Sequence, residues 1–378
     1  MDNYKEIRPY LDSEVKAVLH EYKEHPMIRA LLHFTFPDKS QEEIEKILDS
    51  CNSITDFQSR VIYHSVRNIL EKSSEGFFTH GFEKLKPDTS YLFVSNHRDI
   101  VMDTSLLNVA LLDNGLVLTA SAIGDNLVHK PFLLALSKLV RNFLIKRGLS
   151  PREMLESSRK VSAYVKHLLE EEGRSVWIAQ REGRTKDGND QTQQGVLKML
   201  ALASEERQIM DYFKKLRITP VAISYEYDPT DLLKMPELMA RHYDIEYVKT
   251  SNEDFNSILK GALGQKKRIC IQVGEITDQQ LDAIRDSGES VNRQFQMLAD
   301  CIDEQIRRNY RLWPTNYLAY DLLHNTERFA DHYSEKEKRQ FERRLERRVG
   351  EEDDIARKNF LAMYANPVIN RMKYETTL

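Results

Sequence analysis

The sequence predicts an α/β fold, with a central mixed and largely parallel sheet flanked by helices, and with helical extensions at both ends. Short apolar runs alternate with helical patterns between residues 76 and 277. Residues 1–75 and 278–378 carry helical patterns alone. We therefore expect a helical N-terminal region over 1–75, an α/β domain over 76–277 and a helical C-terminal region over 278–378.

Turn signals and periodicity predict the individual elements in order. Ser40-Gln41-Glu42-Glu43 is typical of a capping box at a helix start. Ser150 and Pro151 have the residue types of an N-cap and a first helical position. Pro220 has no backbone N–H, so it favours an edge strand or a strand start. Apolar runs predict strands over 91–94, 116–120, 143–145, 175–179, 217–225 and 268–274.

Two basic helical patterns each have two interpretations. From His129 to Arg141, apolar residues form one face and Lys and Arg the other. This pattern is typical of a core helix with a solvated basic side, which we favour, or of a helix lying on anionic lipid. The charged run 334–354 is interpreted in the same way, as a solvated helix with an apolar stripe, and lipid contact is the alternative.

Composition excludes several classes of protein. The net charge of −4 gives no global indication of nucleic-acid binding. The three cysteines are scattered without a CxxC pair, which indicates neither a disulfide framework nor a zinc site and fits a reducing cytoplasm. No uncharged apolar run reaches the ~18 residues that span a bilayer. Any contact with a membrane is therefore expected to be peripheral.

A histidine follows the first predicted strand of the α/β region. His97 lies between the apolar run 91–94 and a helical pattern, with Asp99 and Asp103 close by in sequence. A neutral imidazole beside a carboxylate is a general base held in one tautomer. The alternative is a loop histidine with Asp103 as a helix N-cap, and without further motifs this alternative is favoured.

Cations follow two later strands. Lys146 and Arg147 end the run 143–145. The loop Gln180–Gly188 places three cations around a glycine that allows close backbone approach, and such a loop suits a phosphate or a carboxylate. A polar β-turn with self-paired charges is an equally good interpretation of this loop alone.

Four strand-end motifs occur in one order, and this order resembles the glycerolipid acyltransferase family, which includes glycerol-3-phosphate and 1-acylglycerol-3-phosphate acyltransferases. The first is similar to the family's His-x4-Asp signature, and the others to its Phe-Ile-x-Arg, Glu-Gly-x-Arg-Ser and Val-Pro-Val blocks. The resemblance covers roughly the middle half of the chain. The motifs here are Asn96-His97…Asp103, Phe143…Lys146-Arg147, Glu182-Gly183-Arg184-Thr185 and Thr219-Pro220-Val221-Ala222-Ile223-Ser224-Tyr225-Glu226.

The first motif departs from the family pattern, because five residues rather than four separate His97 from Asp103. Either the turn is one residue longer and Asp103 still reaches the ring, or Asp99 orients it. We favour Asp103, since it lies at the predicted helix start, where the family's aspartate lies. The cation patterns of the second and third motifs are also shifted.

The resemblance implies roles for the motif residues. His97 is the general base that removes the acceptor hydroxyl's proton, and Asp103 orients the ring. Arg147 and Arg184, with Lys186 in support, bind the acceptor phosphate. Glu182 orients a cation or contacts the acceptor, and the strand of Pro220 borders the acyl chain. Further implied substrate-binding residues are Asn96, Arg98, Lys146 and Gly183.

The implied function is phospholipid O-acyl transfer to glycerol 3-phosphate or 1-acylglycerol 3-phosphate. The implied partners are an acyl donor, either acyl-carrier protein or a coenzyme A thioester, and the inner face of the cytoplasmic membrane; no metal or bound cofactor is required. One alternative is an O-acyltransferase for another amphiphile, such as an N-acyl amino acid. The other is a non-catalytic lipid-binding protein of the same fold.

Overall fold

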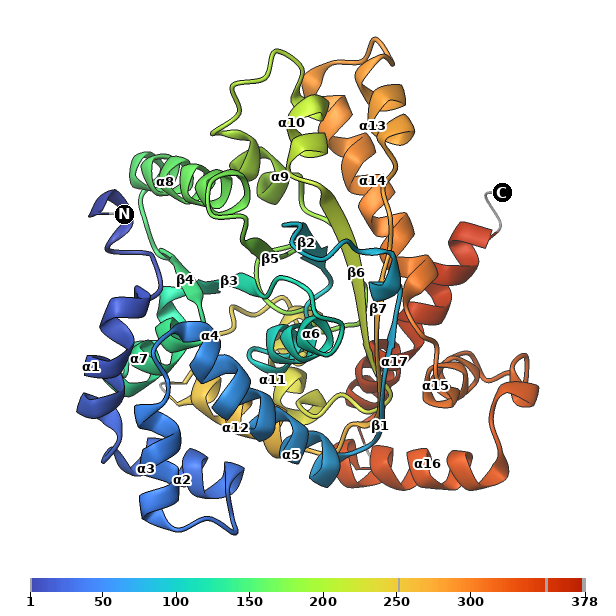
Figure 1. Ribbon diagram of the computed structural model, residues 1–378. Coiled ribbons are helices and arrows are strands. Elements are labelled where there is room, and N and C mark those ends of the chain that lie inside the picture. Colours follow the sequence, from blue (N-terminus) through green and yellow to red (C-terminus); the bar gives the residue numbers. More distant parts are fainter. Residues whose placement is uncertain (1, 251, 351–352, 376–378) are drawn as a thin grey trace.

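The computed structural model describes residues 2–250, 252–350 and 353–375. In this part of the chain, seven strands form one sheet in the order β1-β7-β6-β2-β5-β3-β4 (Figure 1). Strands β2 to β6 are mutually parallel, whereas β7 is antiparallel to β6 and pairs in parallel with β1. The predicted mixed, largely parallel sheet is confirmed. The bounds are β1 (Ser74–His80), β2 (Leu92–Ser95), β3 (Thr119–Gly124), β4 (Asn142–Ile145), β5 (Ser175–Ala179), β6 (Ile218–Tyr225) and β7 (Lys267–Val273).

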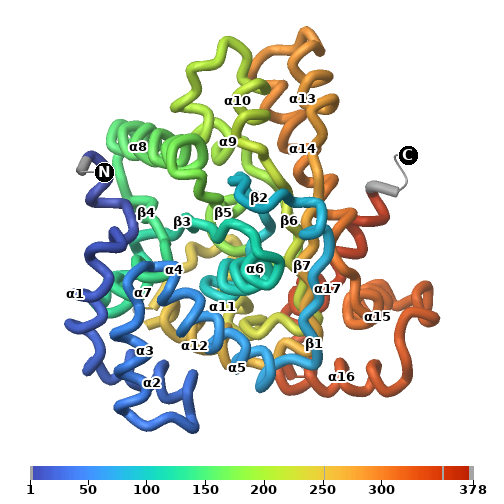
Figure 2. The backbone as a smooth tube through the Cα atoms, viewed as in Figure 1, coloured from blue at the N-terminus to red at the C-terminus, as the bar shows by residue number. Residues whose placement is uncertain are grey.

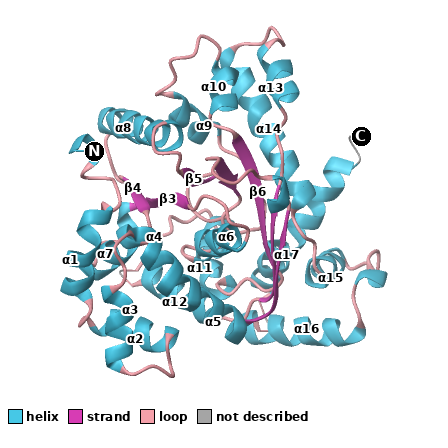
Figure 3. Ribbon diagram, in the orientation of Figure 1, coloured by secondary structure: helices cyan, strands magenta, loops and turns pink. Residues whose placement is uncertain are grey.

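Helices cover both faces of the sheet, and Figure 3 shows the magenta strands between them. Successive strand residues point to opposite faces, so Leu92 and Val94 of β2 pack into one apolar cluster and Phe93 into another. The second cluster includes α5 (Tyr63–Ser73) and α6 (Met102–Asp113). The first includes α8 (Pro151–Glu170), α9 (Gln194–Ala201), α10 (Ile209–Lys215), α13 (Asp278–Arg285) and α14 (Val291–Asn309).

Three strands differ from the sequence-based expectation. The second predicted strand begins later, at Thr119, because the Leu116 N–H closes the end of α6 on the Leu111 carbonyl (2.9 Å). The segment Ser74–His80, for which no strand was predicted, forms β1 by pairing with β7. Pro220 lies third in β6, which is an interior strand and not an edge; the β7 ladder begins one residue later, so the missing N–H falls at its end.

The N-terminal helices form a separate apolar cluster with α7 (Pro131–Leu139). Ala135 and Leu139 of α7 are buried in it, and Leu136 packs against it. The interpretation of this segment as a core helix therefore fits the structure better than a helix lying on lipid. The predicted capping box closes α3, where Glu43 accepts from the Ser40 N–H (2.8 Å). The helices are α1 (Asp12–Tyr22), α2 (Pro26–Thr35), α3 (Gln41–Asp49) and α4 (Ile54–Phe57).

The C-terminal helices pack beside α11 (Asp231–His242) around a fourth cluster. In the charged helix α16, Phe341 and Leu345 are fully buried, while most of its charged residues lie on the solvent side, as expected. Figure 2 places the N-terminal segment beside α8, near β4, and α17 toward the opposite end of the sheet, near β7. The bounds are α12 (Glu253–Leu263), α15 (Pro314–His324), α16 (Glu335–Val349) and α17 (Asp354–Glu375).

Across the described ranges, none of the helices is both long enough and apolar enough to cross a membrane. The strands of the sheet begin at Ser74 and end at Val273. The exact boundaries between the three expected regions stay a prediction.

Candidate active site

The site is centred on His97, in the turn that joins β2 to α6. The residue before it fixes this turn to the sheet. Asn96 donates through Nδ2 to the Ile223 carbonyl (2.9 Å) and accepts through Oδ1 from the Ile223 N–H (2.8 Å). Both bonds are buried, where hydrogen bonds are strong, so they hold the start of the turn firmly against β6.

Asp103 is the carboxylate that contacts the histidine ring. Its Oδ2 lies 2.8 Å from His97 Nδ1. The same oxygen accepts from the backbone N–H groups of Arg98 (2.6 Å) and Asp99 (3.0 Å). Asp103 is fully buried, and these donors compensate for its removal from water. With Nδ1 bound to Asp103, Nε2 is the ring nitrogen that is left to meet a substrate.

Asp99 bonds the start of the helix. Its Oδ1 accepts from the N–H groups of Val101 (3.0 Å) and Met102 (2.8 Å) and so caps the first turn of α6. The extra residue between His97 and Asp103 is accommodated by this capped turn. Burial, followed by the nearby charge of Asp103, raises the pKa of the Asp99 carboxyl.

The other neighbour of the histidine ring is Trp177 of β5. The two ring centroids are 5.3 Å apart and the planes meet at 71°, an edge-to-face contact. The indole N–H of Trp177 donates to Ser95 Oγ (2.9 Å), which fixes the indole in turn. The His97 side chain is 13% exposed, so the ring is held on two sides and reaches solvent only through the cavity described next.

A cavity of about 760 Å³ lies at the ends of β2, β3, β4 and β5 and contains the His97 ring in its wall. The carboxyl ends of parallel strands are the usual location of a binding crevice in an open α/β sheet. Seven of the predicted site residues line the cavity: His97, Lys146, Arg147, Glu182, Gly183, Arg184 and Lys186. Its apolar wall includes Ile123, Leu127, Met154, Val161, Val196 and Met199.

The cations of the cavity differ in how they are paired. Arg147 forms an ion pair with Glu182 (2.5 Å), and Lys186 forms one with Glu237 (2.5 Å). Arg184 Nη2 contacts Ser257 Oγ (3.4 Å), while its buried Nη1 has no hydrogen-bond partner in the part of the chain that the structure describes. A buried guanidinium with an unsatisfied N–H is a strong donor for an anion. Burial lowers the pKa of Lys186.

The loop that carries Arg184 is tied directly to the histidine turn. The Thr185 N–H donates to the His97 carbonyl (2.9 Å), and Thr185 Oγ1 donates to Asp190 (2.8 Å). Arg98 forms a buried ion pair with the same Asp190 (2.5 Å). These contacts fix the position of the cationic loop relative to the imidazole.

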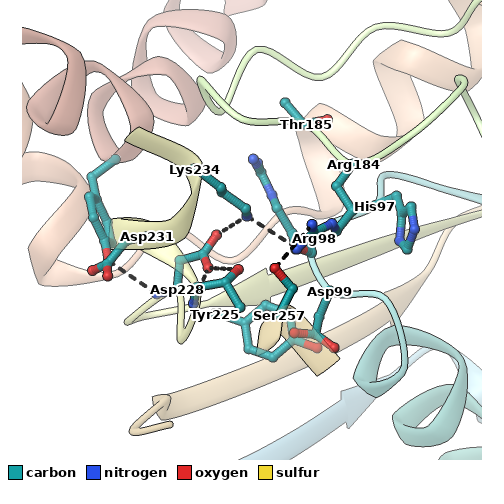
Figure 4. A network of polar contacts seen from close by, with 12 residues as sticks. His97, Arg98, Asp99, Arg184, Thr185, Tyr225, Asp228, Asp231, Lys234 and Ser257 are labelled. Carbon is teal, nitrogen blue, oxygen red and sulfur yellow. Dashed lines mark hydrogen bonds and ion pairs between the residues drawn. The ribbon is translucent and has the colours of Figure 1, made fainter. Parts of the chain in front are cut away.

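A second buried ion pair, between Lys234 and Asp228, supports the turn that carries His97 (Figure 4). Lys234 of α11 donates to the Arg98 carbonyl (3.0 Å) and pairs with Asp228. Because Lys234 and Asp228 are buried together, each compensates the other's charge.

Four predicted site residues lie outside the cavity wall: Asp103, which bonds His97, and three others. Asn96 bonds Ile223, Arg98 bonds Asp190, and the Pro220 carbonyl accepts from the Gly274 N–H (2.8 Å). These contacts hold the turn, the loop and the sheet together. The three residues do not line the cavity in which a substrate would bind.

Several residues at the site were not anticipated from the sequence. Tyr225 donates its hydroxyl to Asp103 Oδ1 (2.8 Å), and the helix α12 lies against the histidine turn. A Cβ on Gly261 of that helix would lie 1.9 Å from Asp99 Oδ2. Tyr225 ends a predicted strand, which was a sequence indication that it could lie at the site. No sequence pattern indicated that the chain between β6 and β7 brings Lys249 and Asp254 to the cavity.

Residues 76–224 match a family model described as Acyltransferase, and this span contains the first three motifs and most of the fourth. No curated protein matches the sequence. Among solved structures, the 1-acyl-sn-glycerophosphate acyltransferase of Thermotoga maritima is similar, with 13% identity and a TM-score of 0.38, covering 78% of this chain and 94% of that one. Residues 76–224 therefore form an acyltransferase-family domain, and this domain supports an acyltransferase enzyme.

Proposed function

We propose that this acyltransferase moves a fatty acyl group from an acyl thioester to the hydroxyl of glycerol 3-phosphate or 1-acylglycerol 3-phosphate. The observation that carries the proposal is that one cavity holds an imidazole backed by a buried carboxylate, a group of cations and an apolar wall. These three features match the reacting hydroxyl, the phosphate and the acyl chain of such a reaction.

In the proposed reaction, His97 acts as the general base. Its Nε2 takes the proton of the acceptor hydroxyl while that oxygen attacks the thioester carbonyl carbon. Asp103 holds the ring in the tautomer with the proton on Nδ1 and stabilises the imidazolium that forms. When the tetrahedral intermediate collapses, the C–S bond breaks and the proton on Nε2 passes to the leaving thiolate. The acyl group moves in one direct transfer, without an acyl-enzyme.

The acceptor phosphate is assigned to the cations of the cavity, with Arg184 as the principal contact. Its Nη1 is buried without a hydrogen-bond partner among the described residues, so a phosphate oxygen would complete it. Lys186 and Arg147 lie around the same cavity, but each is already paired with a glutamate. We propose that Glu182 releases Arg147 when the phosphate binds. This positioning would hold the acceptor hydroxyl near His97.

The donor and the acceptor class are tested together by a substrate panel. Purified protein is incubated with acyl-coenzyme A or acyl-carrier protein and with glycerol 3-phosphate, 1-acylglycerol 3-phosphate or an N-acyl amino acid. We expect an O-acylated product only with a phosphorylated glycerol. If only the N-acyl amino acid is acylated, the proposed acceptor is wrong and the N-acyl amino acid takes its place. If no pair of substrates reacts, a lipid-binding role without catalysis is favoured.

We also propose that the protein contacts the inner face of the cytoplasmic membrane at the rim of this cavity. Met154 lines the cavity and is 55% exposed, and Leu155 beside it is also exposed. In the segment that leads to Lys249, which lines the cavity, Ile245 and Val248 are 63% and 77% exposed. Exposed apolar side chains at the mouth of a lipid-binding cavity are suited to enter the interface of a bilayer.

We place this contact at the rim and not at the basic helical segment, whose alternative interpretation was a helix lying on lipid. The segment from His129 to Arg147 has its apolar residues Leu136 and Leu139 packed against the N-terminal helices. Those side chains are therefore used inside the protein and do not face a bilayer.

A further inference from the structure

We propose that Tyr225 is a positioning residue of the acyl-transfer site, acting on His97 through Asp103. The inference rests on the proposed role of His97 as the general base. The Tyr225 hydroxyl donates to Asp103 Oδ1 (2.8 Å), while His97 and the two backbone N–H groups all bond the other oxygen, Oδ2. Among the described residues, Tyr225 is thus the one side chain that hydrogen-bonds Oδ1.

The location of Tyr225 makes this contact rigid. It is the last residue of β6, paired with Ile269 of β7, and its ring is buried in the cluster that also contains α6. Burial and the neighbouring Asp103 raise the pKa of the phenol well above its usual range, so the hydroxyl keeps its proton and donates. The bond connects β6 with the first turn of α6 and sets the rotation of the Asp103 carboxylate about its own side chain.

This geometry has a chemical consequence for the base. A buried carboxylate accepts hydrogen bonds only, and an oxygen left without a donor there is strongly disfavoured. With Tyr225 on one oxygen, Oδ2 stays directed at His97 Nδ1 throughout proton transfer. Without it, the carboxylate can rotate away from Nδ1, and the imidazolium is held less firmly.

The test is Tyr225→Phe, which removes the hydroxyl and keeps the ring. We expect kcat to fall about 5- to 20-fold with little change in KM for either substrate, as for loss of one hydrogen bond to a charged group. The acid limb of the pH–rate profile should move downward by about half a pH unit, because an imidazolium that Asp103 holds less firmly loses its proton at a lower pH. The charged groups near the pair, Arg98, Asp99 and Asp228, are unchanged by the substitution.

Tyr333→Phe is the matched control. Its hydroxyl also donates to a buried aspartate, Asp321 of α15, at 2.9 Å, and that pair lies in the C-terminal region. This variant loses a bond of the same kind, and we expect its kcat and pH profile to equal those of the wild type once the folded fraction is matched.

A double-mutant cycle separates positioning from a merely structural role. In Asp103→Asn the anion is absent, so adding Tyr225→Phe should lower kcat by less than about 2-fold further. A full, additive loss in that background would overturn the inference, as would a Tyr225→Phe enzyme with normal kcat and pH profile. If His97→Ala keeps normal activity, the proposed base itself is wrong, and this outcome is distinct from a failure of Tyr225→Phe alone.

Discussion

At the scale of single residues, the two aspartates of the first motif have separate tasks. Asp103 bonds the imidazole, and Asp99 caps α6. The sequence favoured Asp103 because of its place at the helix start, and the structure gives the physical reason: a capped turn absorbs the additional residue. Tyr225 lies in the fourth motif, but its contact with Asp103 could not be assigned from sequence, since it depends on where α6 packs against β6.

The two aspartates give opposite expectations as variants. Asp103→Asn should lower kcat at least about 100-fold with acceptor KM nearly unchanged, because it removes the charge that stabilises the imidazolium. Asp99→Asn keeps an oxygen for the helix cap and should be mild. Steady-state kinetics, with folding checked by circular dichroism, measure both. A severe kcat loss in Asp99→Asn beside a normal Asp103→Asn would reverse the assignment.

At the scale of elements, prediction succeeded where a strand is defined by its own residues. The run 175–179 is apolar and bounded by polar residues, and it forms β5 as expected. In contrast, β1 is half-exposed and depends on β7, almost 200 residues away, so no local pattern indicated it. The helix α12 was also missed as part of the site, because its approach to Asp99 depends on the missing side chain of Gly261.

The close approach of α12 is tested by Gly261→Ala. The added Cβ would lie 1.9 Å from Asp99 Oδ2 and 2.7 Å from its carboxyl carbon, and that carboxylate is fixed by the helix cap. We expect a loss of about 1–3 kcal/mol in the free energy of unfolding, measured in urea. Gly195→Ala in α9 is the control: a Cβ there meets nothing within 4 Å, so it should stabilise by up to about 1 kcal/mol. Equal effects of the two variants would contradict the packing described for α12.

Asp303 of α14 holds the loop that carries Arg184. Its ionisation should make the stability of the protein depend on pH. Asp303 accepts from Thr192 N (2.7 Å) and Oγ1 (2.5 Å), and burial raises its pKa from 3.8 to about 6. A raised carboxyl pKa means that the folded state binds more protons, so this group's contribution to stability falls as pH rises from about 4 to about 6. The full change is on the order of 3 kcal/mol.

Asp303→Asn should therefore flatten the dependence of the urea midpoint on pH over this range, since an amide still accepts from Thr192 and does not ionise. Asp300→Asn, on the exposed side of the same helix, is the control and should follow the wild type. If the urea midpoint of Asp303→Asn depends on pH as steeply as that of the wild type, ionisation of Asp303 does not contribute to the pH dependence of stability.

At the scale of the whole molecule, the sheet places the histidine, the cationic loop and the apolar wall around one cavity. The exposed Met154 lines this cavity, and the exposed Ile245 and Val248 shortly precede its lining residue Lys249. The order of the motifs in the sequence indicated the histidine and the cationic loop. The rim could not be predicted, because the segments that form it are far apart in the sequence.

Vesicle flotation tests the rim. The wild type should float with phosphatidylcholine–phosphatidylglycerol vesicles and leave them in carbonate. Ile245→Ser with Val248→Ser should weaken binding at least about 5-fold, because two exposed apolar side chains are lost. Lys249 is already paired with Asp254 (2.9 Å), so high salt should have less effect than this double substitution. Leu263→Ser, at an exposed position near the end of α12, is the control. Equal binding by the double variant and the control would place the contact elsewhere.

The central claim is that His97 is the base of acyl transfer in this cavity. The most direct measurement is the steady-state rate of acyl transfer from a thioester to a phosphorylated glycerol by the wild type and by folded His97→Ala. We predict a fall in kcat of about 100-fold or more, as for the loss of a positioned base, with an unchanged circular dichroism spectrum. Near-normal turnover by a folded His97→Ala protein would contradict the account.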